Sequence, residues 1–236
     1  MTLPAWHEEP ISATHDRNTF DCGDAVLNTF LRHHARQSHE RGGAKTFLAI
    51  VDDDRKPILG FYSLAPASVV YESAPVLIKR GLARHDVPVF RLARLGVDRT
   101  VQGCGLGGQL LMAAGRRCLR VATEVGGVAL LIDAKNERIA QWYGSFGALQ
   151  LLDRPLSLLL PLKTIHDALS KAGKDWGRRS EVGNCLKTED RRQRAEVGGR
   201  KSEVGGRRSE VGGRRAGRKG CGVIQTTPNG RQAGQA

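Results

Sequence analysis

The spacing of apolar residues predicts a helix between Asp21 and Gly43. Apolar side chains recur there every three or four positions, an aspartate opens the segment, and paired glycines close it. The predicted apolar stripe consists of Val26, Leu27, Phe30, Leu31 and His34. The nearly opposite face carries Arg32, Arg36 and His39. Solvent exposure explains this basic face, and contact with a polyanion is the alternative.

Six apolar runs have the length and composition of strands, at residues 46–52, 58–72, 89–97, 127–134, 148–152 and 156–162. The first two flank the polar turn DDRKP, which predicts an antiparallel hairpin. The fourth is nearly all apolar, as is typical of a central strand buried on both faces. Prolines and a glycine interrupt residues 73–88, so we expect a loop with one short helix there.

A second long helix is predicted after Gly108. Its apolar stripe consists of Leu110, Leu111, Ala114, Cys118, Val121 and Val125, whereas Gln109, Arg116 and Arg120 face away. This pattern predicts a helix packed on a sheet. Asn136 is placed to cap a shorter helix that Gly147 ends, and a closing helix is expected at residues 163–173.

The pattern of apolar positions is lost beyond Trp176. There QRAEVGG, RKSEVGG and RRSEVGG follow one another at a seven-residue period. Paired glycines in each repeat forbid a stable coiled coil, and one valine per repeat cannot build a solenoid core. We therefore expect residues 1–176 to form one domain and residues 177–236 to be a disordered tail. An extension without a specific role and a nucleic-acid-binding arm are both open.

The distribution of charge changes at the same boundary. Residues 1–176 contain 22 Lys and Arg against 18 Asp and Glu, whereas residues 177–236 contain 15 against 6. Most of the net charge of +13 therefore belongs to the tail. The basic total says little about the partners of the folded part.

The five cysteines show neither a C-x-x-C pair nor zinc-ligand spacing, so we expect reduced thiols and no metal site. The initial segment MTLPAWHEEP lacks a basic stretch followed by an apolar run, and no segment reaches the ~18 apolar residues of a membrane span. We expect a soluble cytoplasmic protein that does not associate with membranes.

A glycine turn lies in the segment RLARLGVDRTVQGCGLGGQLL, between a predicted strand and a predicted helix. Its glycines are Gly103, Gly105, Gly107 and Gly108. Glycines let the backbone curl tightly against a ligand, and the following helix start directs free N–H groups and a positive dipole end at an anion. The segment therefore predicts a site for a phosphate group.

One candidate ligand is a dinucleotide. Gly103, Gly105 and Gly108 match G-x-G-x-x-G, and Asp133 ends the next strand, where such a fold places its ribose-binding acid. However, residues 98–102 separate the strand from the first glycine, and the strands before it resemble antiparallel hairpins. Too little chain follows Asp133 for a doubly wound sheet.

The other candidate is acetyl-coenzyme A. The pattern Gln102-x-x-Gly105-x-Gly107, with the order of elements around it, resembles the pyrophosphate signature of GNAT acyltransferases. Over residues 10–173, FDCGDAVLNTFL, RLARLGVDRTVQGCGLGGQLL, DAKNERIAQWYGSFG and LLLPLKT resemble the GNAT toxins of type II toxin–antitoxin modules, which acetylate the α-amino group of aminoacyl-tRNA. The resemblance implies an α+β fold of α/β/α layers, with a mixed, mostly antiparallel sheet flanked by helices.

The resemblance also implies roles for individual residues. The strand at Leu95, Gly96 and Val97 would offer backbone groups to the acetyl-pantetheine arm. The pyrophosphate would be wrapped by N–H groups of Gln102, Gly103, Gly105, Gly107 and Gly108, and Asn136 joins the cofactor-binding set. Tyr143 takes the place of the catalytic tyrosine. Gln102 replaces an arginine that is common in the family, which removes one positive charge from the loop.

The chemistry of direct acetyl transfer agrees with this set. An amine attacks the thioester carbonyl, an N–H group near Val97 stabilises the oxyanion, and Tyr143 donates its proton to the leaving thiolate. Without the family resemblance, Tyr143 is better explained as an ordinary half-buried aromatic residue beside Trp142. No Glu or His stands out as a general base, which favours an α-amine of pKa about 7.7–8.0 over a lysine amine near 10.4.

The expected substrate is aminoacyl-tRNA, with Arg32, Arg36, Arg91 and Arg94 as candidate contacts. The family implies a ribbon-helix-helix antitoxin as partner, and a homodimer. Two other functions are open: acetylation of a small amine or a protein N-terminus, and non-catalytic binding of nucleic acid through the arginine-rich tail.

Overall fold

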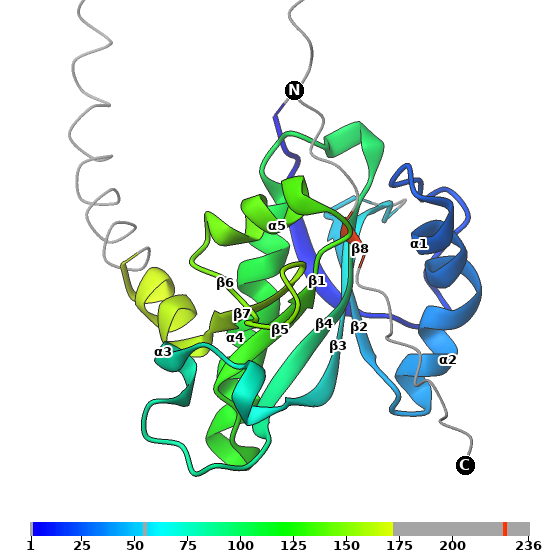
Figure 1. The fold of residues 1–236 in the computed structure, drawn as a ribbon. Coiled ribbons are helices and arrows are strands. Elements are labelled where there is room, and N and C mark those ends of the chain that lie inside the picture. The colour runs from blue at the N-terminus through cyan, green and yellow to red at the C-terminus, as the bar shows by residue number, and fades with distance from the viewer. Residues whose placement is uncertain (1, 54–55, 172–223, 226–236) are drawn as a thin grey trace, which may run out of the picture. The chain divides into compact units, whose positions relative to one another are not determined.

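The computed structural model describes residues 2–53, 56–171 and 224–225. The described strands form one sheet in the order β1-β2-β3-β4-β5-β7-β6, and β8 also pairs with β4 (Figure 1). They are β1 (Trp6–Pro10), β2 (Lys45–Val51), β3 (Ile58–Val69), β4 (Val87–Val97), β5 (Ala129–Asp133), β6 (Leu149–Gln150), β7 (Ser157–Pro161) and β8 (Ile224–Gln225).

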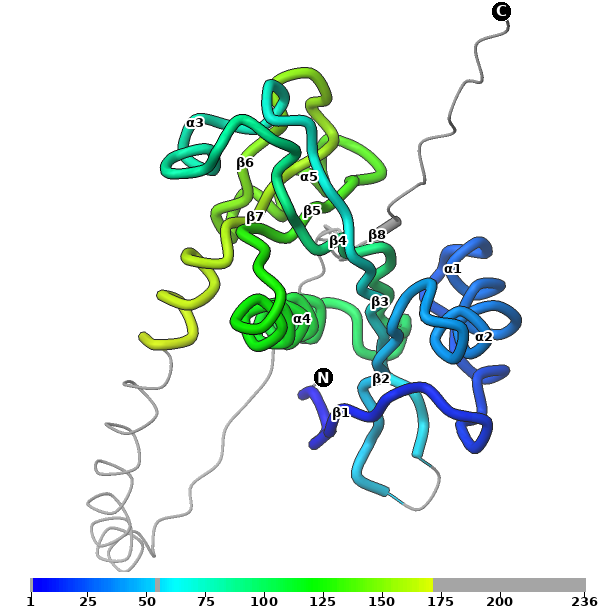
Figure 2. Tube along the Cα trace, turned by 90° about the horizontal axis from the view of Figure 1, so that it is seen from below, coloured from blue at the N-terminus to red at the C-terminus, as the bar shows by residue number. Residues whose placement is uncertain are grey.

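Helices cover both faces of the sheet. In Figure 2, α1 (Ala25–Thr29) and α2 (Ala35–Glu40) lie on one side of β2 and β3, and α4 (Leu106–Val125) lies on the other. The remaining helical elements are the π-helix η1 (Phe30–His34), the 3-10 helices η2 (Tyr71–Ser73) and η3 (Arg99–Val101), α3 (Val76–Lys79), α5 (Glu137–Gly144), and residues 162–171. The predicted layers of helix, mixed sheet and helix are confirmed.

The pairing of the described strands excludes the dinucleotide fold. β4 and β5 run parallel, whereas the other described pairs are antiparallel. A doubly wound sheet needs a series of parallel strands. The literal G-x-G-x-x-G match is therefore misleading, and Asp133 instead pairs with Arg91 and accepts a hydrogen bond from Ser157.

The first predicted helix forms, but its buried stripe differs from the prediction. Asp24 caps it, because one carboxylate oxygen accepts hydrogen bonds from the N–H groups of Val26 and Leu27 at 2.9 and 3.1 Å. The buried residues are Leu27, Leu31 and Ala35, four positions apart, since the π-helical turn uses one extra residue. Val26 is 61% exposed and His34 is exposed, so their predicted places on the stripe are wrong.

The segment Trp6–Pro10 was not predicted as a strand, yet it pairs along its whole length with β2. Its sequence, WHEEP, is polar and has no alternating apolar residues. Pairing with a neighbour, and not local pattern, therefore makes β1 a strand.

The second long helix is confirmed over Leu106–Val125, and the first part of its apolar stripe packs on the sheet. Leu110, Leu111, Ala114 and Cys118 are buried. Val121 and Val125 are 39% and 73% exposed, because they face an open groove, so the prediction that they pack on the sheet is wrong. The hairpin, the cap at Asn136 and the closing helix are present at or near their predicted places.

Among the described residues, those up to Asp167 together with residues 224–225 belong to one compact unit, and residues 168–171 belong to another. The sheet belongs to the first unit. Apart from residues 224–225, the predicted tail at 177–236 lies outside the described residues. Within the described part, no helix is long and apolar enough to cross a bilayer, and no cluster of His, Cys, Asp and Glu is arranged to hold a metal ion.

Candidate active site

A bulge in β4 separates it from β5 and opens an edge of the sheet. The register between β3 and β4 shifts where Ser63 pairs with Arg94 and Leu64 with Leu92, so Ala93 is the extra residue. β5 pairs with β4 at Val89 to Arg91, and this pairing ends just before the bulge. The predicted cofactor strand, Leu95 to Val97, therefore lies on a diverging edge.

Backbone groups on that edge can bind an extended chain. β8 pairs there antiparallel, with Ile224 opposite Leu95 and Gln225 opposite Arg94. An extended ligand with amide groups would use the same N–H and C=O groups as this strand. The geometry fits the amides of a pantetheine arm.

The glycine turn presents bare backbone to open space. Gly103 and Gly105 have left-handed φ values of 82° and 87°, and a Cβ added to either would meet no atom within 4 Å. Left-handed φ favours glycine, and open space in front of the turn leaves room for a ligand. These two glycines therefore have the backbone conformation and the open surroundings that a phosphate-binding turn requires.

The N-terminus of α4 lacks a side-chain cap. Gly105 is its N-cap residue and has no side chain to accept a hydrogen bond from the first turn. The N–H groups of Leu106, Gly107 and Gly108 begin a helix of 20 residues, whose dipole places positive charge there. An anion fits this end of the helix.

Gly107 and Gly108 also have a packing role that the sequence did not indicate. A Cβ on Gly107 would lie 3.7 Å from Trp142, and one on Gly108 would lie 3.2 Å from Phe146. The ring of Trp142 lies 4.9 Å from both Tyr143 and Phe146, measured between centroids. The first turn of α4 thus packs against Trp142 and Phe146, and Trp142 in turn contacts the ring of Tyr143.

Tyr143 is fully buried, at 0% exposure, and not half-buried. Its hydroxyl has no hydrogen-bond partner among the described residues. Burial raises the pKa of Tyr143 well above its ordinary value, so the phenol keeps its proton. A buried hydroxyl without a partner costs about 1–3 kcal/mol, which a bound ligand atom would offset.

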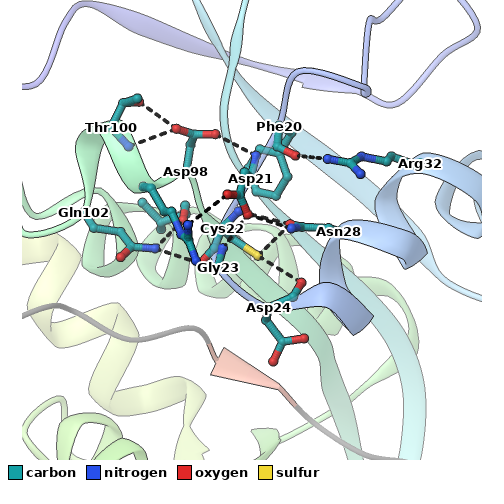
Figure 3. A network of polar contacts seen from close by, with 12 residues as sticks. Phe20, Asp21, Cys22, Gly23, Asp24, Asn28, Arg32, Asp98, Thr100 and Gln102 are labelled. Carbon is teal, nitrogen blue, oxygen red and sulfur yellow. Dashed lines mark hydrogen bonds and ion pairs between the residues drawn. The ribbon is translucent and has the colours of Figure 1, made fainter.

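Gln102 uses its side chain to join two distant segments. The side-chain amide nitrogen donates to the carbonyl oxygens of Cys22 and Val97, each at 2.9 Å (Figure 3). Asp98 reinforces this junction, because its carboxylate accepts from the N–H of Asp21 at 2.9 Å and from Thr100. Since the Gln102 side-chain amide nitrogen is engaged in this way, the predicted contact of Gln102 with a phosphate would use its backbone N–H.

Asp24 and Lys135 connect α1 with the loop between β5 and α5. Lys135 Nζ lies 2.8 Å from one carboxylate oxygen of Asp24, and the other oxygen caps α1. Burial acts to raise the pKa of Asp24, but the Lys135 ammonium and two backbone N–H groups hold it below its ordinary value. No sequence pattern relates these residues, which are 111 positions apart. Asn136, next to Lys135, caps α5 through Ile139 N at 3.0 Å.

The four predicted RNA-binding arginines have different environments. Arg32 donates to the Phe20 carbonyl oxygen at 2.8 Å, and Arg36 pairs with Glu40 at 2.7 Å. Arg91 pairs with Asp133, next to the parallel strand pair. Arg94 lies 4.6 Å from the Phe30 ring centroid and lines a pocket between α1 and β4 with Val26 and His34.

Comparison with known proteins gives specific similarities, although no family model matches the chain. A tRNA-acetylating toxin of Mycobacterium tuberculosis is 36% identical over 153 residues, which cover 65% of this chain and 90% of that protein. A probable toxin TacT of Sinorhizobium fredii is 26% identical over 170 residues, covering 68% and 93%.

Solved structures have the same fold. AtaT complexed with acetyl-methionyl-tRNAfMet has a TM-score of 0.66 at 26% identity, covering 70% of this chain and 99% of that one. An AtaT variant with a tyrosine changed to phenylalanine, bound to the C-terminus of the antitoxin AtaR and to acetyl-CoA, has a TM-score of 0.60 at 26% identity, covering 70% and 98%.

Proposed function

Because the chain belongs to the family of GNAT tRNA-acetylating toxins, we propose that it transfers the acetyl group of acetyl-CoA to the α-amino group of an aminoacyl-tRNA. The α-amine of aminoacyl-tRNA is the nucleophile that forms the next peptide bond. Once it is acetylated it cannot act as this nucleophile, so the reaction inhibits translation. The observation that carries the proposal is the fully buried hydroxyl of Tyr143, which has no hydrogen-bond partner among the described residues and belongs to a ring in contact with Trp142, the residue next to Gly107.

Acetyl-CoA supplies an activated acetyl thioester when it is bound. The N–H groups of Gly103, Gly105, Gly107 and Gly108 and of the first turn of α4 would hold its pyrophosphate. The open edge of β4 at Leu95, Gly96 and Val97 would hold its amide arm. Gln102 contributes through its backbone, and Asn136 orients α5 by capping it.

Tyr143 would donate its phenolic proton to the sulfur of the leaving group. Burial keeps the phenol protonated, because it raises the pKa of Tyr143. Its position is fixed by the edge-on contact with the Trp142 ring and by the contact of Trp142 with the first turn of α4. An N–H group near Val97 would stabilise the negative charge that develops on the carbonyl oxygen.

The acceptor is an amine that is partly neutral at physiological pH. An α-amino group with a pKa of about 7.7–8.0 needs no strong base, unlike a lysine amine near 10.4. We assign Arg94 to the aminoacyl end, because it lines the pocket between α1 and β4 and lies over the Phe30 ring. Arg32, Arg36 and Arg91 complete the proposed tRNA-binding set.

An antitoxin of the ribbon-helix-helix class would neutralise this toxin in the cytoplasm, where charged tRNA is found. We further infer a homodimer, and a catalytic domain at residues 1–176 followed by the repeat tail at 177–236. The complex of AtaT with the C-terminus of its antitoxin supports a peptide-like partner.

Incubation with labelled acetyl-CoA and total aminoacyl-tRNA tests the function. Label is expected on charged tRNA and not on deacylated tRNA. Label that appears on small amines or protein N-termini, with none on charged tRNA, would contradict it. The same incubation is repeated with a chain that lacks residues 177–236. Acetylation that persists without the tail separates catalysis from binding of nucleic acid through the tail.

A further inference from the structure

An apolar groove lies beside α4, outside the proposed active site. Six apolar side chains form much of its lining, those of Phe47, Leu64, Phe90, Cys118, Val121 and Val125. The hollow measures about 500 Å³. It is large enough to take several side chains of a partner.

The exposed valines of α4 continue a buried stripe. Ala114 and Cys118 face the sheet, and the same helical spacing then places Val121 and Val125 in the groove at 39% and 73% exposure. Isolated apolar residues on a surface are ordinary. Two that extend a core stripe into a hollow indicate a surface that is completed by another molecule.

The rim of the groove is basic. Lys45, Arg117 and Arg120 line it, and the exposed Arg116 adjoins it on the same helix. Arg117 lies over the Phe47 ring at 3.5 Å and is paired with Glu8. Lys45 donates one hydrogen bond to the His39 carbonyl oxygen at 2.8 Å but has no acidic side chain beside it in the lining, so its charge is available to a partner together with those of the exposed Arg116 and Arg120. The described residues that line the groove include no acidic side chain.

We propose that this groove binds an acidic amphipathic segment of a protein partner. Apolar side chains of the segment lie against Val121, Val125 and the strand residues, and its carboxylates pair with Lys45 and Arg120. This mode buries one apolar face of a helix in a groove, and charge at the rim sets its orientation. The inference does not depend on acetyl transfer.

Charge argues against three other occupants. A second copy of the chain would bring the same basic rim against itself. Residues 177–236 carry 15 Lys and Arg against 6 Asp and Glu, so the chain's own tail would also be repelled. RNA phosphates match the rim, but the apolar lining offers them no partner.

Fluorescence anisotropy with the full chain tests the proposal. The probe is a labelled helical peptide with leucines on one face and glutamates on the other, and its counterpart has lysine at each glutamate. The acidic peptide is expected to bind saturably and at least tenfold more tightly than the basic one. Val125→Asp and Arg120→Glu, both at exposed positions, are each expected to weaken this binding at least tenfold.

Leu152→Asp is the matched control, because Leu152 is 68% exposed and lies outside the groove. It is expected to bind the acidic peptide like the wild type. Equal binding of the two peptides, no saturable binding, or unchanged binding by Val125→Asp or Arg120→Glu overturns the proposal. A raised KM for aminoacyl-tRNA in Arg120→Glu with unchanged peptide binding would assign the groove to RNA. Peptide binding remains measurable even if no variant acetylates tRNA.

Discussion

Gln102 and Cys22 are 80 positions apart in sequence, yet the Gln102 side-chain amide donates to the Cys22 carbonyl oxygen at 2.9 Å. The same nitrogen donates to the carbonyl oxygen of Val97. One side chain therefore fixes the loop before α1 to the end of β4, directly before the glycine turn. Gln102 therefore has a structural role at the start of this turn.

Gln102→Ala is expected to lower the free energy of unfolding by about 1–2 kcal/mol, because two hydrogen bonds are lost. It is also expected to raise the Kd for acetyl-CoA, since the glycine turn loses its anchor. Thermal unfolding and calorimetric titration measure the two effects. Gln141→Ala, at an exposed position on α5, serves as the control and should change neither quantity. An unchanged Tm in Gln102→Ala would show that the junction contributes nothing to stability.

Tyr143→Phe is expected to reduce kcat by about 10²–10⁴-fold, because general acid catalysis is lost. The Tm should stay the same or rise, since the removed hydroxyl is buried and has no partner among the described residues. Acetyl-CoA binding should persist. Single-turnover acetylation, thermal unfolding and calorimetric titration with acetyl-CoA measure the three quantities, and Tyr71→Phe, at a partly buried tyrosine outside the site, is the control and should keep full activity. Full activity in Tyr143→Phe would refute the proton-donor role.

Removing residues 177–236 is expected to lower the KM for acetyl-CoA by about twofold or more. β8 pairs with β4 at Arg94 and Leu95, where the amide arm would bind, so the two compete for one edge. Steady-state kinetics with varied acetyl-CoA measure the effect.

Ile224→Pro in the full chain is the matched control for this deletion. Proline cannot donate to a strand ladder, so it disrupts β8 while the charge of the tail stays. It should lower the KM as the deletion does. A KM that falls in the deletion alone would assign the effect to the charge of the tail.

Stability should depend on pH through a cluster on β1. Hydrogen bonds from His7, and then from His15, lower the pKa of Glu9 from 4.5 to about 2. Hydrogen bonds to Glu9 and Asp52 raise the pKa of His7 above 6.5. The Glu9 contribution is complete above pH 4.5 and is lost as pH falls through about 2. The His7 contribution is complete below pH 6.5 and is lost as pH rises through its raised pKa.

The Tm should therefore decrease on both sides of this pH range, by a modest amount because His7 and Asp52 are exposed to solvent. Thermal unfolding from pH 3 to 9 measures it. Glu9→Gln should reduce the decrease of the Tm at both the acidic and the basic end of the range. Glu124→Gln, at an exposed position on α4, should leave both decreases unchanged. Identical profiles for wild type and Glu9→Gln would contradict the assignment.

The sequence by itself determined the elements whose signals are local. Glycine spacing before an apolar helix located the glycine turn, and the left-handed φ of Gly103 and Gly105 is a conformation that glycine alone adopts readily. The apolar run of β5 and the cap at Asn136 were likewise predictable, because burial on both faces and capping each leave a short pattern.

Tertiary structure decided whatever depends on residues distant in sequence. β1 is polar and becomes a strand by pairing with β2, and the bulge at Ala93 that opens the β4 edge has no local pattern. Full burial of Tyr143, the junction at Gln102 and the exposure of Val125 arise from packing between elements. Periodicity shows which residues share a face of a helix, but only the fold determines what that face contacts.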